Sequence, residues 1–134
     1  MKSLMLAAAV AAFVVAPMAA ADAQGRSRAP AAQQGQNRCG WLSNPTPGNY
    51  WLTDRDGEWT IATQGSDNAP RGWENSPDFS TNGWVATNGS YGYGCACMRV
   101  DVDRSTMRVT RFYSGRPVPI AQCRNDRSLR RPAD

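Results

Sequence analysis

The sequence predicts an all-β domain, either a small antiparallel sandwich or a partly open barrel of short strands and hairpins, stapled by disulfides. The first observation behind this prediction is that apolar residues after about position 38 show no helical periodicity. The second is that Gly, Pro, Asn, Asp and Ser recur every few residues and separate short runs rich in aromatic and β-branched residues. The third is the set of four cysteines in a chain that begins like an exported protein.

The clearest hairpin spans residues 50–63. Its two arms, residues 50–53 and 58–63, alternate in polarity, and Asp54-Arg55-Asp56-Gly57 lies between them. An Asp-Gly pair supplies the positive φ that a tight turn needs. The same segment superficially resembles a calcium loop, but it lacks a third oxygen ligand before the glycine and the distal Glu of such loops. We therefore expect a turn here, and we expect neither a metal site nor a cofactor.

A short strand over residues 83–87 leads into the turn signal Asn88-Gly89, and a longer strand follows over residues 90–102. Gly92 and Gly94 lie inside the longer strand. Glycine in a strand indicates either a bulge or the close approach of another backbone.

The last hairpin turns at residues 103–106. The strand that follows, residues 107–113, continues the alternation of apolar and charged side chains seen just before the turn. Pro117 and Pro119 are then expected to end regular strand pairing.

The four cysteines predict how the fold is tied together. Cys95 and Cys97 lie two apart on a strand, so their side chains share one face, and a bond between them would be strained. Cys39 begins the domain and Cys123 ends it, so we expect the central strand to be joined to both ends, in one of two pairings. A redox-active pair and a four-cysteine metal site are disfavoured, since an oxidising compartment leaves few free thiolates.

The start of the chain predicts export. Residues 1–23 combine a basic start, an apolar run too short for a membrane anchor and a small-x-small cleavage site. Residues 24–37 predict a flexible linker, because they lack large apolar side chains. Residues 38–126 are the predicted single β domain, and residues 127–134 an Arg-rich tail. The expected location is the periplasm or outside the cell, with no membrane anchor after cleavage.

The chain contains no histidine, which removes the commonest general base and metal ligand and lowers the expectation of an enzyme. Nothing in the sequence places two carboxylates across a cleft, as glycosidases require, so we nominate no catalytic residue. The carboxylates considered are Asp54, Asp56, Glu58, Asp101 and Asp103. The net charge of +4 rests on arginine and is better explained by composition bias than by an anion-binding surface. Outside the cytoplasm we expect no nucleic acid partner.

Aromatic side chains are the best lead to a ligand. The five tryptophans are many for so small a domain, and most of them are expected to build its core. The expected exceptions are Trp73, in the long loop over residues 64–82, and Tyr91 and Tyr93, which are two apart on the glycine-spaced strand. If the two central cysteines face the core, however, strand parity buries both tyrosines, unless a bulge at one of the glycines turns them outward.

Three segments carry a resemblance to a known family: residues 39–47, which begin Cys-Gly-Trp; residues 51–59, Trp-Leu-Thr-Asp-Arg-Asp-Gly-Glu-Trp; and residues 88–97, which end Gly-Cys-Ala-Cys. With these segments the sequence resembles an uncharacterised secreted bacterial family, the domain of unknown function 4087. The resemblance covers most of residues 38–124. It implies a small exported domain with a cysteine framework, and it carries no catalytic or binding residues.

These observations favour a binding module whose ligand is an envelope glycan or another secreted protein. The first alternative is a structural envelope protein without a small ligand. The second, less favoured, is a thiol oxidoreductase that uses Cys95 and Cys97. A count of free thiols discriminates the oxidoreductase, and tryptophan fluorescence against cell-wall glycans discriminates the binding module.

Mature protein from the native host is expected to begin at Gln24 or a couple of residues earlier, because signal peptidases cleave after small-x-small motifs. N-terminal sequencing of the exported fraction measures this start. Full-length protein in the cytoplasm, with Met1 retained, would show that residues 1–23 are not a signal peptide.

Overall fold

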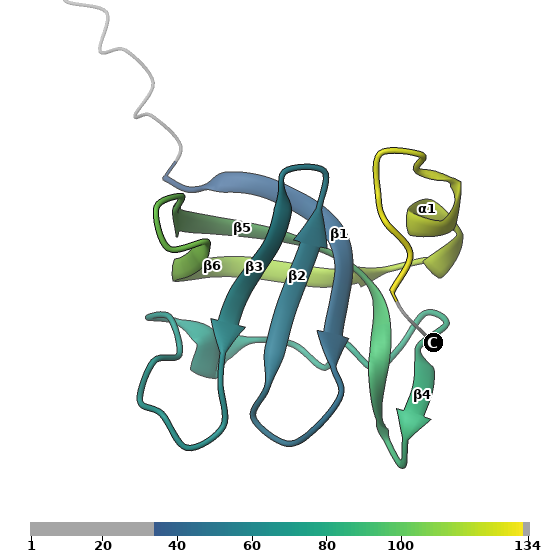
Figure 1. Ribbon diagram of the computed structural model, residues 1–134, viewed down its shortest axis with the longest axis horizontal. Coiled ribbons are helices and arrows are strands. Elements are labelled where there is room, and N and C mark those ends of the chain that lie inside the picture. Colours follow the sequence, from purple (N-terminus) through teal and green to yellow (C-terminus); the bar gives the residue numbers. More distant parts are fainter. Residues whose placement is uncertain (1–33, 133–134) are drawn as a thin grey trace, which may run out of the picture. The chain divides into compact units, whose positions relative to one another are not determined.

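The computed structural model describes residues 34–132, which form six strands and two short helices (Figure 1). The strands are β1 (Gln36–Asn44), β2 (Tyr50–Asp54), β3 (Gly57–Ala62), β4 (Val85–Asn88), β5 (Tyr91–Asp103) and β6 (Arg108–Val118). The helices are the 3-10 turn η1 (Trp73–Asn75) and α1 (Ile120–Asn125). The predicted signal peptide, residues 1–23, lies outside the described residues. Within residues 34–132, no helix is long and apolar enough to span a membrane.

The six strands form one sheet that bends into a partly closed ring. The strand order is β1-β2-β3-β6-β5-β4, and β5 also pairs with β1. This β1–β5 pairing is antiparallel and runs from Gln36 opposite Val100 to Asn44 opposite Gly92. The seam between β3 and β6 is parallel and much shorter, at Thr60 and Arg108. The predicted all-β class, in its partly open barrel form, is therefore confirmed.

The connections follow a Greek-key path. Hairpins join β1 to β2 and β2 to β3. A long connection then carries the chain across to β4, and the β4–β5 hairpin leads into β5, which lies beside β1 (Figure 1). The predicted turn of the β2–β3 hairpin is present, with Asp54 opposite Gly57 and a φ of 133° at that glycine.

Side chains inside the ring form the main core. Leu42 of β1, Leu52 of β2, and Trp59 and Ile61 of β3 are each 0% exposed. The buried side chains that β5 adds to this cluster are Ala96, Met98 and Val100. On β5 the even positions therefore point into the ring and the odd positions point out of it.

A second, smaller cluster lies on the outer face of β1 and β5. It contains the buried residues Trp41, Cys95, Val118 and Cys123. Ile120 of α1 and Leu129 of the following tail pack against it. This helix was not predicted, because one short turn shows too little periodicity to be recognised.

The end of β6 corrects one expectation. The sequence predicted that regular pairing stops before Pro117, but β6 continues to Val118 with Pro117 opposite Ala96. At this end β6 pairs with β5 alone, so it is an edge strand. Proline is tolerated at such an edge because no second strand requires its missing N–H.

The disulfides join β5 to both ends of the domain, as predicted. Cys39 is bonded to Cys97, its direct partner in the β1–β5 register, and Cys95 is bonded to Cys123 of α1. Cys95 and Cys97 are therefore not bonded to each other. This choice between the two open pairings follows from the register, which places Cys39 against Cys97.

The boundary predicted at residue 38 is two residues too late. Gln36 and Asn37, assigned to the linker, belong to β1 and pair with Val100 and Arg99. They lack apolar side chains, so composition alone assigned them to a linker. Backbone pairing with a longer partner strand orders them instead.

A charged group is buried at one end of the ring. The guanidinium of Arg38 forms an ion pair with Asp54, and each side chain is only 5% exposed. Asp54 also accepts a hydrogen bond from the indole N–H of Trp59 (3.0 Å), and the guanidinium lies 4.0 Å from the centre of a Trp59 ring. Arg38 also donates to Asp56 at 3.0 Å, and this hydrogen bond lowers the pKa of the Asp56 carboxyl. Asp54 was predicted only as a turn residue, because its partner lies 16 residues earlier and no local pattern links the two.

Replacing Cys39 and Cys97 together with Ala is expected to lower the free energy of unfolding by about 4 kcal/mol, because their bond links residues 58 apart. Chemical denaturation measures the loss. The matched variant, Cys95→Ala with Cys123→Ala, removes a link across 28 residues and is expected to cost slightly less. Unchanged stability in both variants would show that the disulfide framework is not structural.

Replacing Arg38 with Met is expected to destabilise the fold by ~3–5 kcal/mol, because it leaves the buried Asp54 carboxylate without its cation. Arg104→Met is the matched control, since Arg104 is 68% exposed and pairs with Asp56 at 3.5 Å. We expect that change to cost less than about 1 kcal/mol. Equal effects of the two substitutions in thermal or chemical denaturation would contradict a special role for the buried pair.

Candidate functional site

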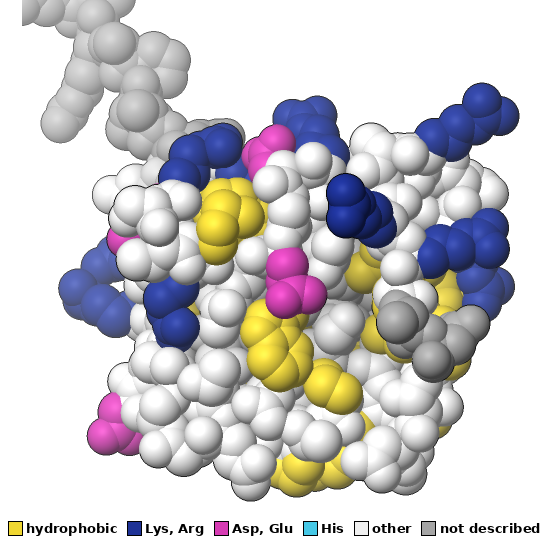
Figure 2. All heavy atoms as spheres, viewed as in Figure 1, with side chains coloured by type: hydrophobic (Ala, Val, Ile, Leu, Met, Phe, Trp, Pro, Cys, Tyr) yellow, Lys and Arg dark blue, Asp and Glu magenta, His cyan; other side chains and the backbone are white. Residues whose placement is uncertain are grey.

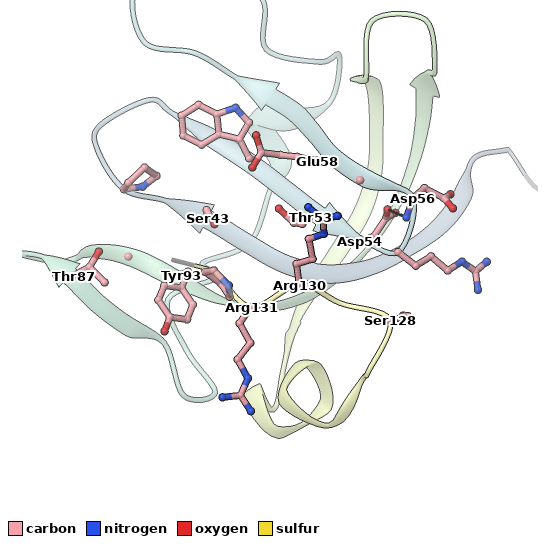
Figure 3. A pocket seen from close by; sticks show the side chains of 16 residues that line it. Ser43, Thr53, Asp54, Asp56, Glu58, Thr87, Tyr93, Ser128, Arg130 and Arg131 are labelled. Carbon is pink, nitrogen blue, oxygen red and sulfur yellow. Dashed lines mark hydrogen bonds between the residues drawn. The ribbon is translucent and has the colours of Figure 1, made fainter. Parts of the chain in front are cut away.

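A groove of about 880 Å³ lies on the outer face of β1, β2 and β3, bordered by the β4–β5 hairpin and the C-terminal tail (Figure 3). The strands contribute Ser43, Trp51, Thr53, Glu58 and Tyr93, and the tail contributes Ser128, Arg130 and Arg131. Figure 2 shows an acidic side chain beside apolar ones near the centre of this face, with basic side chains along its upper edge and beside α1.

Strand register brings two aromatic side chains onto one line across the groove. Trp51 of β2 and Tyr93 of β5 both lie opposite Ser43 of β1, on its two sides. All three residues are half-buried. Because neighbouring strands lie about 4.8 Å apart, the backbones of Trp51 and Tyr93 are separated by roughly 10 Å. The line forms a platform with an aromatic residue at each end and a small hydroxyl residue between them.

A second row of paired residues crosses the same face next to the aromatic platform, and its solvent-accessible residues are polar. Thr53 of β2 lies opposite the exposed Glu58 of β3 on one side and the buried Trp41 of β1 on the other. In Figure 3 the Arg130 side chain reaches from the tail toward Thr53, whereas Arg131 points away toward α1. Hydroxyl, carboxylate and guanidinium groups therefore surround the aromatic platform.

Tyr93 is held in position by its neighbours. Its ring meets the buried Trp41 edge to face, with ring centres 5.7 Å apart and an angle of 81° between the planes. A tyrosine fixed in this way presents a face at little cost in side-chain entropy.

The three residues predicted to bind a ligand do not lie together. Tyr93 lines the groove, whereas Trp73 and Tyr91 line a separate hollow beside the long loop. Trp73 is half-buried and packs against the main core, with its ring 5.3 Å from that of Phe112. Trp73 and Phe79 therefore anchor the long loop to the core.

Strand parity resolves the conflict between the cysteines and the tyrosines. The prediction assumed that the disulfide side of β5 is the core side, but Cys95 lies on the outer face, under α1. Tyr93, of the same parity, therefore lies on the outer face without any bulge in β5, whose pairing with β1 is continuous through Gly92 and Gly94. The register shift in this region lies on β4, between Ala86 and Asn88.

The two glycines allow close approach, which was the second alternative for them. A Cβ at Gly92 would lie 1.8 Å from the Val85 carbonyl oxygen, and one at Gly94 would lie 2.8 Å from the Trp84 ring. The face they form is therefore covered by β4 and Trp84.

Four of the five carboxylates considered as a catalytic pair have structural partners, and Asp54 and Asp56 share one, Arg38. Asp54 pairs with Arg38, Asp101 accepts a hydrogen bond from the Tyr113 hydroxyl (2.7 Å), and Asp103 accepts two from Ser105. Of the five, Asp54, Asp56 and Glu58 line the groove, and Asp101 and Asp103 do not.

Trp51 and Ser43 line the groove but were not predicted from the sequence, and Glu58 was considered only as a catalytic carboxylate. Trp51 was assigned to the core with the tryptophans other than Trp73. The alternation of residues 50–53 contained a usable signal, because a buried Leu52 places Trp51 on the opposite face. The Arg-rich tail packs through Leu129 and brings Arg130 to the groove.

No curated protein and no solved structure shows significant similarity to this chain. A family model does match it, over residues 33–130, and its description is "Protein of unknown function (DUF4087)". That range contains all six strands, both disulfides and α1. The chain therefore belongs to the DUF4087 family, as its cysteine and tryptophan segments suggested.

Proposed function

We propose that this protein is an exported binding module whose ligand is a glycan of the bacterial envelope, held in the outer groove. The observation that carries the proposal is the line Trp51–Ser43–Tyr93, fixed by the pairing of β2 and β5 with β1. Sugar rings have apolar faces that stack on aromatic rings. Two aromatic residues about two strand spacings apart offer room for neighbouring sugars of one chain.

The polar groups around the platform match sugar hydroxyls. Ser43 and Thr53 offer hydroxyls that donate and accept, Glu58 offers acceptors, and Arg130 offers donors. Ligand sites commonly combine an apolar surface with a few polar groups that fix orientation. A groove open to solvent also suits a chain ligand better than a small enclosed metabolite.

The architecture is compatible with this use. Partly open, five-stranded Greek-key barrels include folds that bind oligosaccharides or oligonucleotides on the face of strands 2 and 3. The groove here lies on the corresponding outer face of β2 and β3. This is an analogy at the level of fold, and the proposal rests on the side chains of the groove. Export is supported by two formed disulfides, which persist in oxidising compartments.

The two alternative functions, a structural envelope protein and a thiol oxidoreductase, require different properties of the groove and the disulfides. A structural envelope protein needs no saturable ligand in the groove. A thiol oxidoreductase needs a disulfide that opens during turnover, yet Cys95 and Cys123 are 4% and 3% exposed, which disfavours that pair as a reactive one.

Trp51→Ala and Tyr93→Ala are each expected to weaken glycan binding about tenfold or more, because each removes a central aromatic contact. Isothermal titration of the mature protein with soluble peptidoglycan fragments and other envelope polysaccharides measures the affinity. Tyr113→Ala is the matched control, since Tyr113 is half-buried but lies outside the groove.

The proposal is wrong if no envelope glycan binds the wild-type protein, or if both groove variants bind as tightly as Tyr113→Ala. Binding of a purified secreted protein that depends on Trp51, without any glycan binding, would replace the glycan with a protein partner.

A further inference from the structure

We propose that a second hollow, on another part of the domain, binds a small alkylammonium cation through aromatic faces and the Asp78 carboxylate. The hollow has a volume of about 230 Å³ and lies between the β4–β5 hairpin and the segment that begins at η1. It shares no lining residue with the outer groove. The two sites can therefore be tested separately.

Packed aromatic side chains form one wall of the hollow. The rings of Tyr50 and Trp73 meet edge to face with centres 5.2 Å apart, and Trp73 lies nearly parallel to Phe79 at 6.0 Å. Phe79 is buried in the main core, and Tyr50 and Trp73 pack against that core. The wall is rigid because these contacts fix the rings from behind.

The β4–β5 hairpin supplies two more aromatic residues, Trp84 and Tyr91, both half-buried. The indole N–H of Trp84 donates a hydrogen bond to the Ser90 carbonyl oxygen at 3.1 Å. Its ring lies against Gly94, where a Cβ would come within 2.8 Å. Trp84 is thus held in place without using the whole of its aromatic surface.

Asp78 is the one charged residue among those that line the hollow, all of which belong to the described part of the chain. Ser80 donates hydrogen bonds to its Oδ1 from the backbone N–H (2.8 Å) and from the hydroxyl (2.5 Å). These bonds lower the pKa of the Asp78 carboxyl, so it is ionised at neutral pH. In a chain of net charge +4, a hollow lined by a carboxylate and no arginine favours a cation.

Tyr50 links the aromatic wall to this charge. Burial raises the pKa of the Tyr50 hydroxyl, and the nearby Tyr91 and Asp78 raise it further. The hydroxyl therefore stays protonated and neutral at physiological pH. It can donate a hydrogen bond, and it adds no second negative charge.

The chemistry of the lining selects the class of cation. An alkylammonium group presents methyl or methylene groups that contact aromatic rings, and its charge is attracted to their faces. A hydrated metal ion would gain little from aromatic walls, because it prefers several oxygen ligands. Two sources share this chemistry, a dissolved quaternary amine and the headgroup of a choline lipid.

The test is titration of the mature protein with choline and with 3,3-dimethylbutan-1-ol, its uncharged isostere. Calorimetry and tryptophan fluorescence measure the binding. Choline is expected to bind saturably in the millimolar range, and the isostere at least twofold more weakly, because it lacks the charge. Vesicles of phosphatidylcholine form a second arm. If the protein binds the vesicles at a lower concentration of choline headgroup than the concentration of dissolved choline it needs, the natural ligand is the lipid headgroup.

Asp78→Asn and Tyr91→Leu are each expected to weaken choline binding roughly twofold to fivefold. Asp103→Asn is the matched control, because Asp103 accepts the same pair of hydrogen bonds, from Ser105, outside the hollow. Trp51→Ala, a groove variant, is expected to leave choline binding unchanged. Circular dichroism and the Tm show whether each variant is folded.

Absence of saturable binding in both arms would overturn the proposal, as would equal affinity for choline and its uncharged isostere. Equal weakening by Asp78→Asn and Asp103→Asn would also overturn it, since binding would then reflect net charge alone. Loss of choline binding in the folded Trp51→Ala variant would place the cation in the outer groove instead.

Discussion

The antiparallel pairing of β1 with β5 is the constraint on which the rest of the structure depends. It closes the ring and fixes which residues face inward, because a shift of one residue would move the inward side chains of one of the two strands to the outer face. The Cys39–Cys97 bond lies within this ladder, at a directly opposed pair, so it holds the strands in that register. Leu42 is consequently inside the ring, and Ser43 faces outward opposite Tyr93.

The same register places an arginine inside the ring. Arg38 shares the inward parity of Leu42, and a buried guanidinium is costly unless it is paired and hydrogen-bonded. Asp54 supplies the charge, and the Trp59 indole donates to that carboxylate while its ring lies under the guanidinium. The β2–β3 turn is therefore specified twice, once by the Asp-Gly sequence and once by the position of Arg38. A shifted hairpin would leave a buried charge without a partner.

Local patterns made much of the fold predictable, and non-local pairing limited the rest. Alternation and the Asp-Gly turn identified the β2–β3 hairpin, and the spacing of Cys95 and Cys97 required partners elsewhere. Which set of alternating β5 side chains faces the interior of the ring could not be inferred from the sequence. The reason is that α1 and the tail bury Cys95 on the outer side as fully as the core buries Met98 on the inner side. Of the groove residues, Tyr93 was named as a candidate from the sequence, although strand parity argued for its burial, whereas Trp51 was grouped with the tryptophans expected to build the core.

Tyr91 and Tyr93 show how one strand can serve two surfaces. Both have outward parity on β5, but β5 pairs with β1 only as far as Gly92, so Tyr91 lies beyond the end of that ladder. Tyr93 stays over the β1–β2 face, beside Ser43, whereas Tyr91 lies with β4 at the rim of the other hollow. The missing side chain of Gly92 lets the Val85 backbone approach closely, and the pairing of β4 with β5 keeps it there. The glycines of this strand therefore act as positioning residues for the hairpin, and a rigid, doubly paired strand supports both aromatic surfaces.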